Sequence, residues 1–183
     1  MSSKTALLAK YEYRRRLPHL QKAGAALFVT FCTLRHRALP DLARDIVLEH
    51  WLREAGLLPF DPCGAGAPAR EKPRIITPRI RLHAVIVMPD HVHVLLTPLS
   101  DHAGWPFPLV DILQCCKSVT AHRINRLLGV AGPVWEEESF DHVLRSDESF
   151  AEKCEYIRQN AVQAGLAARG EDYRWLWLEA ELG

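Results

Sequence analysis

The sequence of 183 residues predicts an α+β fold of the ferredoxin-like type: an antiparallel sheet, helices on one face, and a further helix towards the C-terminal end. Two observations predict this class. Short apolar runs alternate with longer helical patterns in the order βαββαβ. Two of the runs are separated only by a Pro-Asp turn at Pro89 and Asp90, which indicates a hairpin. The length fits one domain with a proper core.

The individual elements follow in order along the chain. We expect strands at 26–34, 80–88, 91–97 and 140–144, and helices at 39–55, 109–128 and 146–164. A glycine follows each helical pattern, at Gly56, Gly129 and Gly165. Glycine readily adopts the left-handed conformation that ends many helices, so these residues support the three boundaries.

Two of the predicted helices carry an apolar stripe at helical spacing. Ser146 is the expected N-cap of the last helix, with acidic residues following in its first turn, where the helix dipole favours negative charge. The inward residues of the helix at 109–128 are expected to be Leu109, Leu113, Cys116, Val119, Ile124 and Leu127. Those of the last helix are expected to be Phe150, Cys154, Ile157, Ala161 and Ala164.

The domain organisation is expected to be simple, with one domain over residues 1–183. We expect a basic N-terminal arm at 1–25, a Pro- and Gly-rich loop at 57–79, and a C-terminal tail at 169–183 that packs on the body. No internal repeat interrupts this order.

Composition excludes several classes of protein. The sequence is 48% hydrophobic and 25% charged, as is typical of soluble globular proteins. No apolar run approaches the roughly 20 residues of a membrane helix, and the first ten residues lack the apolar core of a secretory signal. Five cysteines without a C-x-x-C pair argue for a reducing cytoplasm, and against both a disulfide framework and a cysteine-ligated structural zinc.

The net charge of +1 hides an asymmetry between the two halves of the chain. Residues 1–81 carry 15 Lys or Arg against 7 Asp or Glu, and residues 82–183 carry 8 against 15. The basic half could follow the phosphates of a nucleic acid, but taken alone the charge pattern favours a solvated, partly disordered N-terminal arm. On the middle helix, Lys117 and Arg123 are further candidates for contact with a DNA backbone.

The most informative motif is His91-Val92-His93, which lies in a predicted strand. Side chains alternate along a strand, so the two imidazoles point to one face while Val92 points to the other. Such a pair can bind a divalent metal. Two ligands do not define a metal site, however, and the pair can also be polar members of a half-buried strand.

A second segment adds a possible third ligand. On the last predicted helix, Tyr156 and Asn160 fall one turn apart at the edge of the apolar stripe. The amide of Asn160 could complete a metal site, and the phenol of Tyr156 would then stand beside it as a nucleophile. The alternative is a tyrosine with its ring packed and its hydroxyl in water.

These segments resemble a known family, the REP-associated tyrosine transposases, which are single-tyrosine HUH enzymes of the IS200-like superfamily. The matching stretches are Met-Pro-Asp-His-Val-His-Val-Leu-Leu at 88–96 and Tyr-Ile-Arg-Gln-Asn-Ala-Val-Gln-Ala-Gly-Leu at 156–166. Other pieces also match, at 14–19, 28–31, 134–136 and 140–145. Two positions depart from the family pattern. Asp90 stands where Asn is usual, and Ala161 stands where Pro is usual.

The resemblance implies a site and a reaction. His91, His93 and Asn160 would hold Mg²⁺ or Mn²⁺, and Tyr156 would attack single-stranded DNA to form a 5′-phosphotyrosine link. The implied substrates are hairpins formed by repetitive extragenic palindromes (REPs), with a flanking guide sequence contacted by Arg14, Arg15, Arg16 and His19. The resemblance also implies a DNA transposition enzyme of the bacterial cytoplasm and nucleoid, without a membrane partner, as a monomer or homodimer.

Three other functions remain open from the sequence. A replication initiator shares the two motifs but usually brings further domains. A metal-dependent hydrolase would use metal-bound water, so it would leave no covalent DNA. A domesticated protein would bind single-stranded DNA without cutting it.

Overall fold

The computed structural model describes residues 24–59, 77–144 and 147–180. Its strands are β1 (Leu27–Cys32), β2 (Ile80–Val87), β3 (His91–Pro98), β4 (Phe140–Val143) and β5 (Leu176–Leu178). Its helices are α2 (Asp41–Glu54), α3 (Leu109–Leu128) and α4 (Asp147–Gln163), with short 3-10 turns η1 (Leu34–His36) and η2 (Gly170–Asp172). Most of the predicted arm at 1–25 and loop at 57–79, and the predicted N-cap Ser146, lie outside the described residues.

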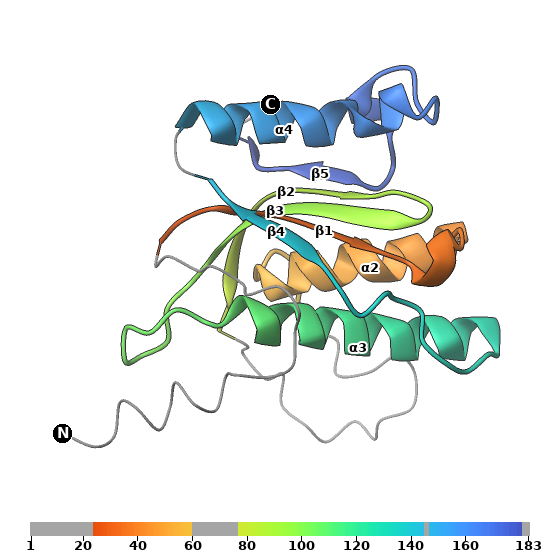
Figure 1. The fold of residues 1–183 in the computed structure, drawn as a ribbon, viewed down its shortest axis with the longest axis horizontal. Coiled ribbons are helices and arrows are strands. Elements are labelled where there is room, and N and C mark those ends of the chain that lie inside the picture. Colours follow the sequence, from red (N-terminus) through yellow and green to blue (C-terminus); the bar gives the residue numbers. More distant parts are fainter. Residues whose placement is uncertain (1–23, 60–76, 145–146, 181–183) are drawn as a thin grey trace.

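The five strands form one antiparallel sheet in the order β4-β1-β3-β2-β5 (Figure 1). α2 and α3 cover one face, and α4 covers the other (Figure 1). From β1 to β4 the element order is βαββαβ, which confirms the predicted α+β class. Within the described residues, we find no helix whose length and hydropathy would let it span a bilayer.

The central strands are buried on both faces because helices cover the sheet from both sides. In β2, the run from Ala84 to Val87 is fully buried, and in β3 so are Val92 and Val94. Strands of this kind appear in a sequence as nearly continuous apolar runs rather than as alternating ones. This is why 80–88 and 91–97 stood out as a hairpin.

The buried stripe of α3 differs from the predicted one. Val119 is 40% exposed, whereas its neighbour Thr120 is fully buried. The Thr120 hydroxyl donates to the carbonyl of Cys116 at 2.6 Å and accepts the indole N–H of Trp135 at 2.9 Å. A threonine satisfied in this way can occupy a core position that hydrophobicity alone assigns to valine. Leu127, also predicted inward, is 43% exposed.

The C-terminal segment adds a strand that the sequence analysis did not predict. After η2, β5 pairs with β2 at the edge of the sheet. Trp175, just before β5, receives the guanidinium of Arg44 at 3.5 Å from its ring centroid, and its indole N–H donates to Asp45 at 2.8 Å. The tail is therefore fastened to α2 as well as to the sheet.

Candidate active site

The two predicted histidines lie at the start of β3, on the face that α4 covers. Val92, between them, points the other way and is fully buried. The ring centroids of His91 and His93 are 4.7 Å apart. His93 is only 6% exposed, whereas His91 is half-buried. The fold thus brings both imidazoles together, as the strand period predicts.

α4 brings the predicted tyrosine to the same place. Its residues Ile157 and Ala161 are fully buried in the core, so Tyr156 lies at the edge of the buried stripe and is 39% exposed. The phenol hydroxyl lies 3.4 Å from Nε2 of His93. Asn160 follows one turn later on the helix and is partly buried. Two segments more than 60 residues apart therefore meet at one site.

Each histidine is held through the same ring nitrogen. Nδ1 of His93 lies 2.7 Å from the hydroxyl of Thr30, its neighbour on β1. Nδ1 of His91 lies 2.7 Å from Oδ1 of Asp90, whose Oδ2 lies 3.1 Å from Nδ1 of His36. A hydrogen bond at one ring nitrogen sets the tautomer and leaves the other nitrogen for a ligand. Nε2 is that nitrogen in both rings.

The charges at the site follow from burial and from these contacts. Burial, together with the nearby charges of His91 and Lys153, lowers the pKa of His93 to about 3. Partial burial would raise the pKa of Asp90, but hydrogen bonds and charge from His91 and His36 outweigh it and lower that pKa. At neutral pH, the site therefore contains a neutral His93, and an ionised Asp90 in contact with His91.

Two site residues were not singled out in the sequence. The ring of Phe28 stacks on His93, with centroids 5.4 Å apart, and meets Tyr156 edge-on at 5.8 Å. The ammonium of Lys153 lies 4.9 Å from the Phe28 centroid and 5.4 Å from the Tyr156 centroid. Lys153 precedes Tyr156 by three positions on α4, and that helical spacing could have identified it.

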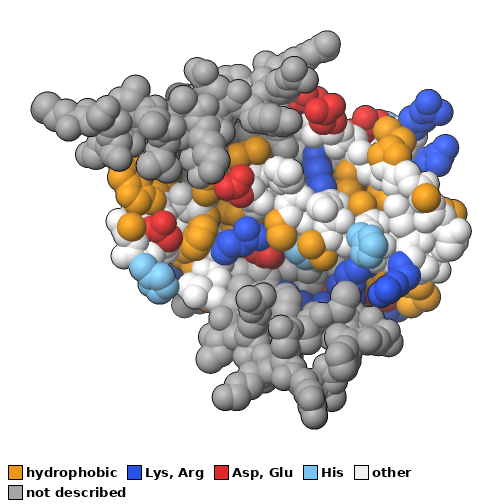
Figure 2. Space-filling model, turned by 90° about the horizontal axis from the view of Figure 1, so that it is seen from below, with side chains coloured by type: hydrophobic (Ala, Val, Ile, Leu, Met, Phe, Trp, Pro, Cys, Tyr) orange, Lys and Arg blue, Asp and Glu red, His pale blue; other side chains and the backbone are white. Residues whose placement is uncertain are grey.

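The other predicted DNA contacts lie elsewhere. Lys117 and Arg123 are on α3, which covers the opposite face of the sheet from Tyr156 (Figure 1). Lys117 Nζ donates to three backbone carbonyls at 136–138, at 2.9 to 3.2 Å, and Arg123 pairs with Glu49 at 3.2 Å. From this side, acidic, basic and hydrophobic side chains are interspersed (Figure 2). The contact of Lys117 and Arg123 with DNA stays a prediction.

The predicted N-terminal contacts lie outside the described residues. They are Arg14, Arg15, Arg16 and His19.

The histidine pair is suited to a divalent metal. A ligating histidine is neutral and typically donates its second ring N–H to a carboxylate, a carbonyl or another polar group. His93 meets the first condition through its low pKa, and both rings meet the second through Asp90 and Thr30. The donor set of two imidazoles, with an amide at Asn160 one helical turn after Tyr156, suits a divalent ion without selecting one.

Comparisons with known proteins bear on the fold. No protein-family model and no curated protein matches the sequence. The chain is similar to the structure of a REP-associated tyrosine transposase bound to a REP hairpin, with a TM-score of 0.61 and 14% identity, over 89% of this chain and 82% of that one.

Two further solved structures are similar at a lower level. A candidate transposase from Deinococcus radiodurans R1 has a TM-score of 0.42 and 19% identity, over 79% of this chain and 95% of that one. A bacterial tRNA(His) guanylyltransferase-like protein in complex with GTP has a TM-score of 0.44 and 15% identity, over 88% and 74%. These two scores are too low to argue from. The first likeness establishes the architecture: the chain has the fold of the REP-associated tyrosine transposase.

Proposed function

We propose that the protein is a metal-dependent single-stranded DNA endonuclease and strand transferase that works through a 5′-phosphotyrosine link. One observation carries the proposal: the hydroxyl of the accessible Tyr156 lies 3.4 Å from the buried His93. A hydrolase that uses metal-bound water has no need of a phenol in this position. A nucleophilic tyrosine needs both features, because it must lie beside the metal and also reach a DNA strand.

His91, His93 and Asn160 would hold the metal, which by resemblance is Mg²⁺ or Mn²⁺. When bound, such an ion polarises a scissile phosphate and offsets negative charge in the transition state. The protein's own contribution is preorganisation, because Asp90 and Thr30 hold both imidazoles before any ligand arrives. Little reorientation of the two rings is then needed on binding.

The proposed reaction exchanges one phosphate ester for another. The phenolic oxygen of Tyr156 attacks phosphorus, the new O–P bond forms, and the bond from phosphorus to the 3′ oxygen breaks. The phenol proton leaves to solvent, and the 3′ oxygen takes up a proton to become a hydroxyl. A second 3′-hydroxyl can reverse the exchange without ATP, since the ester bond is kept in the link.

Lys153 would act on the same step. Its ammonium lies over the rings of Phe28 and Tyr156, close to the proposed nucleophile. A fixed positive charge there would stabilise the negative charge that develops on the phosphate oxygens. Phe28 is buried against His93, so it fixes the position of the rings beside which this ammonium lies.

The proposed substrate is a hairpin formed by a repetitive extragenic palindrome. Support comes from the fold shared with a transposase that is described as bound to such a hairpin. Arg14, Arg15, Arg16 and His19 are the candidates for binding the flanking single strand, and Lys117 and Arg123 for a more distant backbone contact.

Replacing Tyr156 by Phe tests the proposed nucleophile. With labelled single-stranded hairpin DNA and Mn²⁺, the unmodified protein should give a covalent band on a denaturing gel, and EDTA should abolish it. The Tyr156→Phe variant should give no band yet bind the DNA with the same affinity, because only the hydroxyl is removed. Tyr173→Phe is the matched control, since this tyrosine is buried and donates to the carbonyl of Val87.

Each outcome of this experiment separates the candidate functions. A band that persists in Tyr156→Phe excludes this tyrosine as the nucleophile. Metal-dependent cutting without any covalent band indicates a hydrolase. Tight binding without cutting indicates a domesticated DNA-binding protein.

Replacing Lys153 by Met tests the proposed charge. The variant keeps an unbranched apolar side chain and loses the ammonium. We expect the rate of adduct formation to fall roughly tenfold or more, since each 1.36 kcal/mol of lost transition-state stabilisation is tenfold in rate. Lys153→Arg should recover much of it. A Lys153→Met variant with the full single-turnover rate would show that the lysine is only structural.

Replacing Asp90 or Thr30 tests the orientation of the metal ligands. Asp90→Ala and Thr30→Val should each weaken Mn²⁺ binding, measured by calorimetry, by about 10- to 100-fold, as loss of an outer-shell partner does. Asp90→Asn keeps an acceptor for His91 and should lose less. Asp111→Ala, exposed on α3, is the control and should bind normally. Equal affinity in all four variants would contradict the orienting role.

A further inference from the structure

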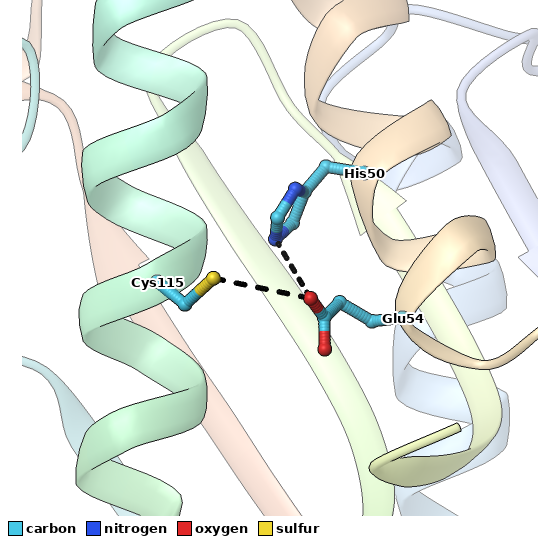
Figure 3. A group of neighbouring side chains, drawn as sticks. All are labelled: His50, Glu54 and Cys115. Carbon is cyan, nitrogen blue, oxygen red and sulfur yellow. Dashed lines mark hydrogen bonds and ion pairs between the residues drawn. The ribbon is translucent and has the colours of Figure 1, made fainter. Parts of the chain in front are cut away.

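A second group of metal-ligating side chains lies on the other side of the sheet from Tyr156. His50 and Glu54 come from α2, and Cys115 comes from α3, so the group lies in the seam between these two helices (Figures 1 and 3). One ligand atom from each residue lies within 4.8 Å of the others. The group shares no residue with the histidine pair of β3.

The three side chains converge on one point. His50 and Glu54 are one turn apart on α2, and Nε2 of His50 lies 3.8 Å from Oε1 of Glu54. Sγ of Cys115 lies 3.9 Å from the same oxygen (Figure 3). Ligands at the corners of a zinc-type tetrahedron, with bonds of about 2.0 to 2.3 Å, lie roughly 3.3 to 3.8 Å apart. Small side-chain movements would close the difference.

His50 is prepared for a ligand that the protein itself does not provide. The residue is only 7% exposed, and its Nε2 has no hydrogen-bond partner among the described residues. Burial lowers the pKa of His50 to about 4, so the ring is neutral at physiological pH and Nε2 can offer a lone pair. A buried polar nitrogen without a partner is destabilising, which calls for an explanation.

Arg79 already pairs with Glu54, and this pairing is compatible with a metal. Its guanidinium donates to Oε2 at 2.8 Å and to Oε1 at 2.9 Å. A carboxylate has about four lone-pair positions, so Glu54 can keep both hydrogen bonds and still offer Oε1. Ligating carboxylates are commonly held in this way by outer hydrogen bonds. The arginine would hold the ligand in place.

The donor set selects the class of metal. A thiolate and an imidazole favour zinc and similar thiophilic ions, whereas Mg²⁺ prefers oxygen ligands. Binding would form a sulfur–metal bond at Cys115 and release the thiol proton to solvent. The thiolate and carboxylate charges together would balance a divalent ion.

We propose that His50, Glu54 and Cys115 form a second metal site, of the zinc class, that joins α2 to α3. Water would fill the fourth position. An ion bound by both helices would stabilise the folded state, and this effect would not depend on DNA binding. This inference is independent of the function proposed for Tyr156, because neither its residues nor its face of the sheet are shared.

Cobalt(II) titration of the reduced, metal-free, full-length protein tests the site. Cobalt bound to a thiolate gives a charge-transfer band in the near ultraviolet, and we expect one such ion per chain. Zinc should displace it and excess Mg²⁺ should not. Cys115→Ala and His50→Gln should lose the band, whereas Cys32→Ala should keep it, since Cys32 is the other partly exposed cysteine in the described part of the chain.

A double variant separates the two sites. His91→Ala with His93→Ala should keep the charge-transfer band, because the histidine pair contains no sulfur ligand. In the His91→Ala, His93→Ala background, zinc should also raise the melting temperature, and a further Cys115→Ala or His50→Gln substitution should remove that rise. A band that is absent from the folded protein, or that depends on Cys32 instead, would show that the group is only an ion-pair network.

Discussion

The burial of β3 between β1 and β2 is the constraint on which the other features depend. Helices cover both faces of this strand, so a polar side chain on it needs a partner or must line a site. The register with β1 supplies one partner by placing Thr30 opposite His93. A slip of one residue would turn both histidines away from α4 and remove them from Tyr156. The geometry of the candidate site therefore depends on the register of the strand pairing.

The proposed metal ligand and the proposed nucleophile differ in their exposure to solvent. His93 is nearly fully buried, which keeps it neutral and rigid, whereas Tyr156 is 39% exposed and open to a strand in solvent. Phe28 is buried beside His93 and packs edge-on against the tyrosine ring, whereas the partly exposed Lys153 places a charge over that ring. If Tyr156 were buried as deeply as His93, DNA could not reach its hydroxyl.

Local periodicity predicted much of this structure, and long-range packing supplied the rest. The order βαββαβ, the hairpin and the stretch 109–128 follow from apolar patterns within single elements. The sequence could not identify Thr30 as a partner of His93, because the two residues are 63 positions apart. It could not identify Asp90 as a partner of His91 either, because adjacency in sequence does not fix the orientation of a side chain. The contact from His36 also lies on left-handed backbone at Arg35 and His36, a conformation that few non-glycine residues adopt. His50, Glu54 and Cys115 meet only because α2 packs on α3. The spacing of the cysteines along the sequence, which argued against a structural zinc, contains no information about this group.

A crystal structure of the protein with Mn²⁺, located by its anomalous scattering, tests the central claim most directly. We expect a peak within bonding distance of Nε2 of both His91 and His93, with the amide of Asn160 as a further ligand and the Tyr156 hydroxyl beside it. Asp90 and Thr30 should stay on the Nδ1 atoms. Coordination through Nδ1, or a folded protein with no manganese at this pair, would contradict the account.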